Sequence, residues 1–83
     1  MSKKNNQYTC IMNFKDKNMP SMRQAVESES AAKTRLNIWY KQFAGVSSFA
    51  MWTPQGDKIC FNSRGDYLFT IPPEACATMG LKP

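Results

Sequence analysis

The segment from Glu29 to Ala44 constrains the fold most strongly, because its apolar residues recur at helical spacing. On a helix with about 3.6 residues per turn, these side chains fall within an arc of about 100°, and polar side chains occupy the opposite side. Ser28 and Ser30 supply hydrogen-bond acceptors for the first turn, and Gly45 is predicted to end the helix in a left-handed conformation. The apolar stripe comprises Ala32, Leu36, Trp39, Tyr40 and Phe43. Such a stripe needs a second layer to pack against, so the rest of the chain must supply one.

Residues 7–27, which precede this helix, are predicted to contribute two strands to that layer. The first half alternates apolar and polar residues with a period of two, as a half-buried strand does. The second strand is expected within residues 21–27, where Met22 and Val26 also fit a helical turn; we favour the strand. Residues 1–6 are predicted to be a flexible, solvated tail.

Residues 46–71, which follow the helix, contain three alternating runs separated by glycine-containing turns. Pro54–Gly56 forms the first turn and Asn62–Gly65 the second, which predicts a β-meander. The two prolines at the start of residues 72–83 end the sheet, and one or two helical turns are expected in this C-terminal segment.

The whole chain, residues 1–83, is therefore predicted to form one α+β domain, with a mainly antiparallel sheet of four or five strands and the helix on one face. Alternation along the strands assigns the residues to two faces. The face predicted to meet the helix comprises Tyr8, Cys10, Met12, Phe14, Phe49, Met51, Ile59, Phe61, Tyr67, Phe69 and Ile71. The opposite face, expected to meet water or a partner, comprises Thr9, Ile11, Asn13, Ser48, Ala50, Trp52, Lys58, Cys60, Asn62, Leu68 and Thr70.

The composition favours an acidic partner over a cationic one. Eleven Lys and Arg residues against six Asp and Glu residues give a net charge of +5, which suits an acidic protein surface, a nucleoprotein complex or nucleic acid itself. The three cysteines are odd in number and widely spaced, and there is no apolar run of the kind found in signal peptides or membrane helices. We therefore expect a cytoplasmic protein that does not engage membranes and is a monomer or a small homo-oligomer.

The sequence also disfavours catalysis, since it has no histidine to act as a general acid or base. Its three cysteines show no CxxC spacing, so no zinc site and no cofactor is predicted. Asp57 and Asp66 each follow a turn glycine, and an approach of the two across the meander would permit a metal-dependent nuclease. We expect instead that both carboxylates bond local backbone, and that the protein is not an enzyme.

Cations on the helix exterior and on the turns are the main candidates for partner binding. Phosphates or acidic side chains bind best where several cations share one surface. An exposed apolar residue among them can anchor a small interface. The candidate partner-binding residues are Lys33, Arg35, Ile38 and Lys41 on the helix, with Lys15, Lys17 and Arg64 on turns.

Trp52 and Lys58 supply an alternative, in which the protein binds DNA or RNA directly. An exposed indole beside a lysine is a platform on which a single-stranded base can stack. The competing interpretation is that the C-terminal segment covers Trp52.

The order of elements resembles that of several small phage anti-CRISPR proteins. The resemblance covers residues 7–71 and lies in the run from Val26 to Lys33, an Ala-rich helix extending to Phe43, Gly45 and the hairpin meander that follows. It implies a non-catalytic inhibitor that occludes a surface of a nucleic-acid-processing host complex. No binding residue follows from the resemblance, because it is one of layout.

Overall fold

The computed structural model describes residues 7–82. In chain order the elements are β1 (Tyr8–Phe14), β2 (Met22–Val26), α1 (Glu29–Gln42), β3 (Val46–Trp52), β4 (Lys58–Phe61), β5 (Tyr67–Ile71) and α2 (Pro73–Met79). The predicted α+β fold is confirmed: the strands form one antiparallel sheet in the order β2-β1-β3-β4-β5. The ambiguous segment at residues 21–27 contains a strand, and the tail predicted at residues 1–6 lies outside the described residues.

Helix α1 begins as the sequence predicts and ends earlier. The Ser28 hydroxyl oxygen accepts a hydrogen bond from the Ala31 amide at 3.1 Å, which caps the first turn. The helix ends at Gln42, because Phe43 takes an extended conformation and packs its ring edge-to-face on Phe14 at 6.3 Å. Gly45 has a positive φ of 74°, yet it lies in the connection to β3 and does not cap the helix.

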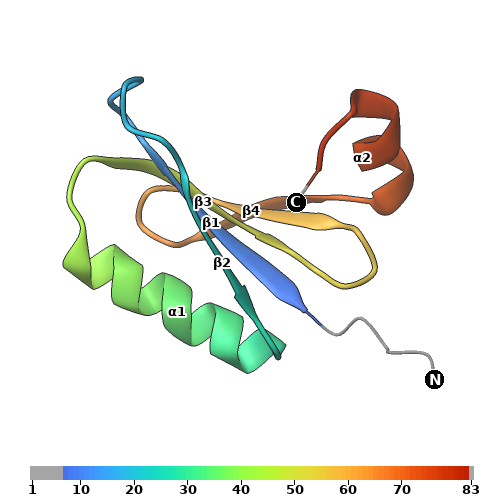
Figure 1. Ribbon diagram of the computed structural model, residues 1–83, viewed down its shortest axis with the longest axis horizontal. Helices are drawn as coiled ribbons and strands as arrows, with labels where there is room; N and C mark the ends of the chain where they lie inside the picture. The colour runs from blue at the N-terminus through green and yellow to red at the C-terminus, as the bar shows by residue number, and fades with distance from the viewer. Residues whose placement is uncertain (1–6, 83) are drawn as a thin grey trace.

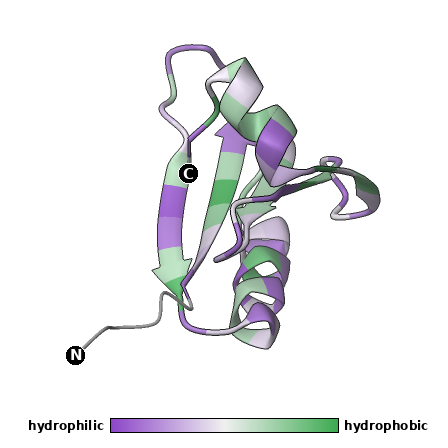
Figure 2. Cartoon of the chain, turned by 90° about the vertical axis from the view of Figure 1, so that its right-hand side faces the viewer, coloured by the Kyte–Doolittle hydropathy of each residue, from purple (hydrophilic) through white to green (hydrophobic). Residues whose placement is uncertain are grey.

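The main core lies between α1 and one face of the sheet, where α1 packs against β1, β2 and β3 (Figure 1). Bands of hydrophobic and hydrophilic residues alternate along α1 in Figure 2, as expected for a helix with one buried side. Of the predicted stripe, Ala32, Leu36 and Trp39 are buried, whereas Tyr40 is 43% exposed and Phe43 37% exposed. The stripe was therefore predicted too wide at its C-terminal end.

A β-bulge changes the predicted faces of β5. Tyr67 pairs with Phe61 and Phe69 with Cys60, so Leu68 is an extra residue in the ladder. Because the side-chain period of a strand is two, the extra residue moves the rest of β5 to the other face. The assignment of Phe69 and Ile71 to the helix face is wrong, and Thr70 pairs with Ile59 on the helix face.

A second, smaller core lies on the sheet face opposite α1, under the C-terminal segment. Figure 1 shows α2 on the other side of the sheet from α1. This core consists of Ile11, Ala50, Trp52 and Cys76, with Ile71 and Leu81 packed against it. Part of the face expected to meet water or a partner is thus covered by the chain itself.

Cys10 behaves as a small apolar residue of the main core. Its thiol is fully buried and donates a weak hydrogen bond to the Ala32 carbonyl oxygen at 3.6 Å. Burial raises the pKa of the Cys10 thiol from 9.0 to about 11, although the nearby positive charge of Arg35 acts in the opposite direction.

This raised pKa predicts a loss of stability at alkaline pH. Above about pH 9 the unfolded chain releases the Cys10 proton that the native state retains, so the free energy of unfolding falls by about 1.4 kcal/mol per pH unit up to about pH 11. Urea unfolding at several pH values measures this slope, and Cys10→Ala provides the control, since it removes this thiol and leaves every other side chain in place. Identical slopes for the two proteins would contradict the prediction.

Candidate binding site

A groove opens between α1 and the β4–β5 hairpin, because one helix cannot cover five strands. A helix is about 10–12 Å wide with its side chains, whereas five strands spaced about 4.8 Å apart span about 19 Å. Helix α1 lies over β1, β2 and β3, and the helix-side face of β4 and β5 remains open. The hollow left there has a volume of about 370 Å³.

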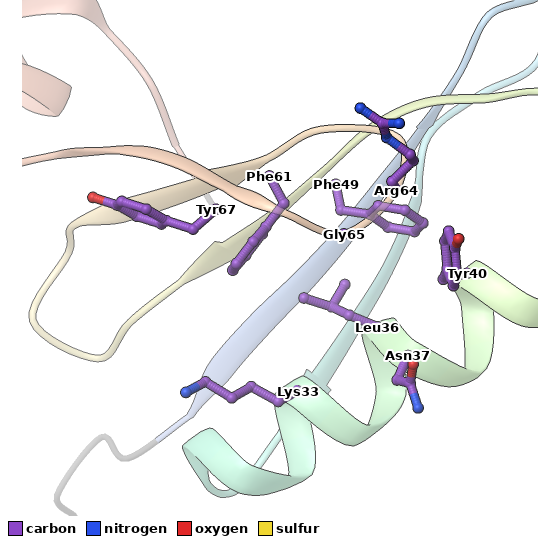
Figure 3. Close-up of a pocket in the computed structure, with 9 residues that line it drawn as sticks. All are labelled: Lys33, Leu36, Asn37, Tyr40, Phe49, Phe61, Arg64, Gly65 and Tyr67. Carbon is purple, nitrogen blue, oxygen red and sulfur yellow. The ribbon is translucent and has the colours of Figure 1, made fainter.

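Aromatic side chains from four elements line this groove, and cations lie at its two sides (Figure 3). Tyr40 comes from α1, Phe49 and Phe61 form the floor, and Tyr67 is 60% exposed at the start of β5. The complete lining is Lys33, Leu36, Asn37, Tyr40, Phe49, Phe61, Arg64, Gly65 and Tyr67. We call this set the aromatic groove. A smaller hollow adjoins it and extends along β4 and β5, sharing Lys33, Phe61 and Tyr67.

The turn between β4 and β5 holds Arg64 at the groove. The Asn62 side-chain oxygen accepts hydrogen bonds from the Arg64 and Asp66 amides, both at 2.9 Å, and Gly65 supplies the positive φ of 85° that the turn requires. The Arg64 guanidinium lies 3.9 Å from the Asp66 carboxylate in a strongly exposed pair. Such a pair is weak, so Arg64 is free to turn to an acidic partner.

Lys33 lies on the helix side of the groove. Its ammonium group is 3.3 Å from the Glu29 carboxylate, one helical turn earlier. Both side chains are more than half exposed, and pairs of this type contribute only about 0.3–0.5 kcal/mol. The groove therefore combines an apolar floor with two cations, Lys33 and Arg64, whose present ion pairs can be broken at little cost in free energy.

The other predicted binding residues do not line the aromatic groove. Lys41 and Ile38 are exposed elsewhere on α1, and Lys15 and Lys17 are exposed in the β1–β2 turn. Arg35 departs from its predicted place on the helix exterior: it is half-buried, and its Nε atom is buried without a hydrogen-bond partner.

The alternative platform at Trp52 is not available to a base. Trp52 is only 3% exposed, because α2 and the end of the chain cover it, as the competing interpretation predicted. Lys58 lies over the indole with its ammonium 5.8 Å from the ring centroid, a cation–π contact that belongs to the fold.

The two aspartates of the nuclease alternative lie at opposite ends of β4. Asp57 is in the turn before this strand and accepts a hydrogen bond from the Thr53 hydroxyl, while Asp66 is in the turn after it. Four strand residues at about 3.3 Å each separate them by roughly 13 Å or more, too far for one metal ion. Within residues 7–82, no group of three or more His, Cys, Asp or Glu side chains is placed to hold a metal.

Comparison of the chain with protein-family models, curated proteins and solved structures gave no match. Neither α1 nor α2 has the length and apolar character needed to cross a bilayer. The case for a site therefore depends on the geometry of the groove.

Sequence reasoning missed the aromatic groove, because it assigned Tyr40, Phe61 and Tyr67 to the core. A signal was nevertheless present in the predicted elements. One helix was set against four or five strands, and the width of a helix is too small to cover them all.

Proposed function

We propose that the protein is a non-catalytic binding domain that holds an apolar side chain from an acidic protein surface in its aromatic groove. The observation that carries this proposal is the open, aromatic floor between two exposed cations, Lys33 and Arg64. Buried aromatic contacts supply most of the affinity of protein interfaces, and complementary charge at the rim steers the partner. The net charge of +5 also favours an acidic partner.

The finer parts of the proposal concern the kind of partner. The layout resembles that of phage anti-CRISPR proteins, so we propose an inhibitor that occludes a surface of a nucleic-acid-processing complex inside the host cell. The three cysteines of the chain are unpaired, which fits a reducing cytoplasm. The absence of a histidine leaves the usual nucleophilic and acid–base arrangements without a base, which favours binding over catalysis.

Charge reversal at the groove tests the proposal. The partner is first recovered from the host in stoichiometric amount and purified. We expect Lys33→Glu with Arg64→Glu to lower the affinity for this partner by at least tenfold. The matched control is Lys41→Glu with Lys17→Glu, which makes the same change in net charge outside the groove. Both pairs leave the melting temperature nearly unchanged, because all four side chains are exposed. Equal loss of binding in the two double variants would reject the groove as the site.

A direct single-stranded DNA or RNA ligand is the second candidate, because the groove also offers aromatic rings beside cations. Two phosphate contacts, at Lys33 and Arg64, give a slope of about −1.4 in a plot of log affinity against log salt. A fluorescent oligonucleotide titrated at several salt concentrations measures it. Absence of binding at low salt removes this candidate and leaves the protein partner.

A further inference from the structure

The aromatic groove continues into the smaller hollow beside it, and the two together run along α1. The α1 residues that line them lie on one side of the helix, at helical spacing: Glu29, Lys33, Leu36, Asn37 and Tyr40. Lys33 lies towards one end of this side of α1 and Tyr40 towards the other (Figure 3). From Glu29 to Tyr40 a helix rises about 16 Å, or three turns, which is longer than any single side chain. We call the two hollows together the extended groove.

Two rows of paired side chains form the floor of the extended groove. Each row takes one residue from β3, one from β4 and one from β5. The first row is Phe49, Phe61 and Tyr67, and the second is Met51, Ile59 and Thr70. Phe49 and Met51 belong to the main core, so both rows face the side of the sheet that carries α1. The open part of each row is therefore the part that β4 and β5 supply.

This open floor has the width of one more helix. β1 lies in the middle of the three strands that α1 covers, and β4 lies two strand spacings, or about 10 Å, from β1. Packed helices keep their axes about 8–10 Å apart. A helix packed beside α1 would therefore lie over β4, with its sides over β3 and β5.

We infer, resting on the function proposed above, that the acidic partner occupies the extended groove with one amphipathic helix of about three turns that lies beside α1. Such a helix completes the layer that α1 leaves unfinished and covers both rows of the floor. An extended partner chain would instead pair with the edge of β5 in the plane of the sheet and leave that floor open.

The cations of the groove indicate where the partner helix is acidic. Lys33 lies on the α1 side, and Arg64 lies near the end of the groove that Tyr40 marks. Lys33 precedes Tyr40 by seven residues, which is about 10 Å along a helix. We therefore expect acidic side chains about two turns apart on the flanks of the partner helix. Its apolar side chains are expected at a spacing of three or four residues, on the side that meets the floor.

Synthetic peptides test this inference without the natural partner. The probe is a peptide of about 15 residues built from Leu, Ala and Glu, with Leu at every third or fourth position and Glu on the flanks. One control peptide has the same composition with Leu at alternate positions, as in a strand, and another has Lys in place of Glu. Fluorescence anisotropy is expected to show the probe binding at least tenfold more tightly than either control. Because a free helix of this length is only marginally stable, circular dichroism is expected to show its helix content rising on binding.

Each of the other outcomes contradicts the inference. Binding of the alternating peptide as tight as that of the probe would mean that the occupant is not a helix, and equal binding of the lysine peptide would mean that it is not acidic. Failure of all three peptides to bind at millimolar concentration would also overturn the inference. The function proposed above would still stand in that case if charge reversal at Lys33 and Arg64 weakened the recovered partner.

Thr70→Glu provides a second measurement, on the protein itself. Thr70 is exposed in the second row of the floor and does not line the aromatic groove, so only an occupant that spans both rows covers it. A carboxylate there repels an acidic helix, and the affinity for the probe and for the recovered partner is expected to fall about fivefold or more.

Thr34→Glu is the matched control for Thr70→Glu. Thr34 is exposed on α1 and lines neither hollow, so the same change in charge is expected to leave the affinity unchanged. Both variants are expected to keep the natural melting temperature, because both positions are exposed. Equal affinities of the two variants would show that the occupant does not reach the second row. That result would overturn the three-turn helix and leave a shorter contact within the aromatic groove.

Discussion

Replacing Trp39 with alanine is expected to lower the free energy of unfolding by about 3–5 kcal/mol, the range for removing a large aromatic side chain from a core. Trp39 is only 3% exposed and belongs to the cluster that joins α1 to β1 and β3. A domain of 83 residues has a total stability of only several kcal/mol. The variant is therefore expected to be largely unfolded at 37 °C, and circular dichroism with urea titration at low temperature measures the loss.

Tyr40→Ala is the matched control for Trp39→Ala. Tyr40 is the next residue of the same helix, but its ring lies at the edge of the groove and is 43% exposed. Its removal is expected to cost less than about 1.5 kcal/mol, because less apolar area leaves contact with the protein. Equal losses of stability in the two alanine variants would show that the main core does not lie on the side of α1 that carries Trp39.

Replacing Trp52 with alanine is expected to cost a similar 3–5 kcal/mol and to loosen α2. Trp52 is the largest side chain of the smaller core, which is the surface that α2 covers. Cys76 lies in this core and is 3% exposed, so its thiol reports on the attachment of α2. Its reaction with a thiol reagent, measured in a Cys60→Ser background, is expected to become at least tenfold faster in Trp52→Ala.

Trp52→Phe separates the shape of this side chain from its polarity. The Trp52 Nε1 atom is buried without a hydrogen-bond partner, and a buried unsatisfied donor costs about 1–3 kcal/mol. Phenylalanine retains most of the apolar contact and removes that donor, so its cost is expected to be well below that of alanine.

Met79→Ala, on the exposed side of α2, serves as the control for Trp52→Ala and is expected to leave Cys76 protected. Unchanged protection in Trp52→Ala would mean that α2 is held by other contacts.

The fold could be predicted where one local pattern decided the outcome. The start of α1 depends on Ser28 and on residues within one turn of it, so the cap was predictable from adjacent residues. Local pattern did not decide the strand at residues 22–26, because Met22 and Val26 satisfy a period of two and a spacing of four equally well. Both residues pack against the main core, and this packing favours the strand over a helical turn. Such contacts form only in the tertiary structure.

The candidate site was predicted only in part. Lys33 and Arg64 were named as binding residues on charge and position, and they lie at the groove, whereas the remaining members of that set lie elsewhere. Arg35 shows why charge alone is insufficient. Its long side chain lies beside Cys10, half-buried, and nothing in the residues around it in the sequence reveals that neighbour.

By itself, the sequence determined the elements and their order, since helical and strand periodicities, caps and turn glycines act over a few residues. The tertiary structure alone decided which surfaces remain open. Helix α1 is too narrow to cover the whole sheet, so Tyr67 remains exposed and Phe61 is only partly buried. An extra residue at Leu68 moved Phe69 and Ile71 to the other face. Each of these outcomes depends on the relative size and register of segments far apart in the chain, which local periodicity does not encode.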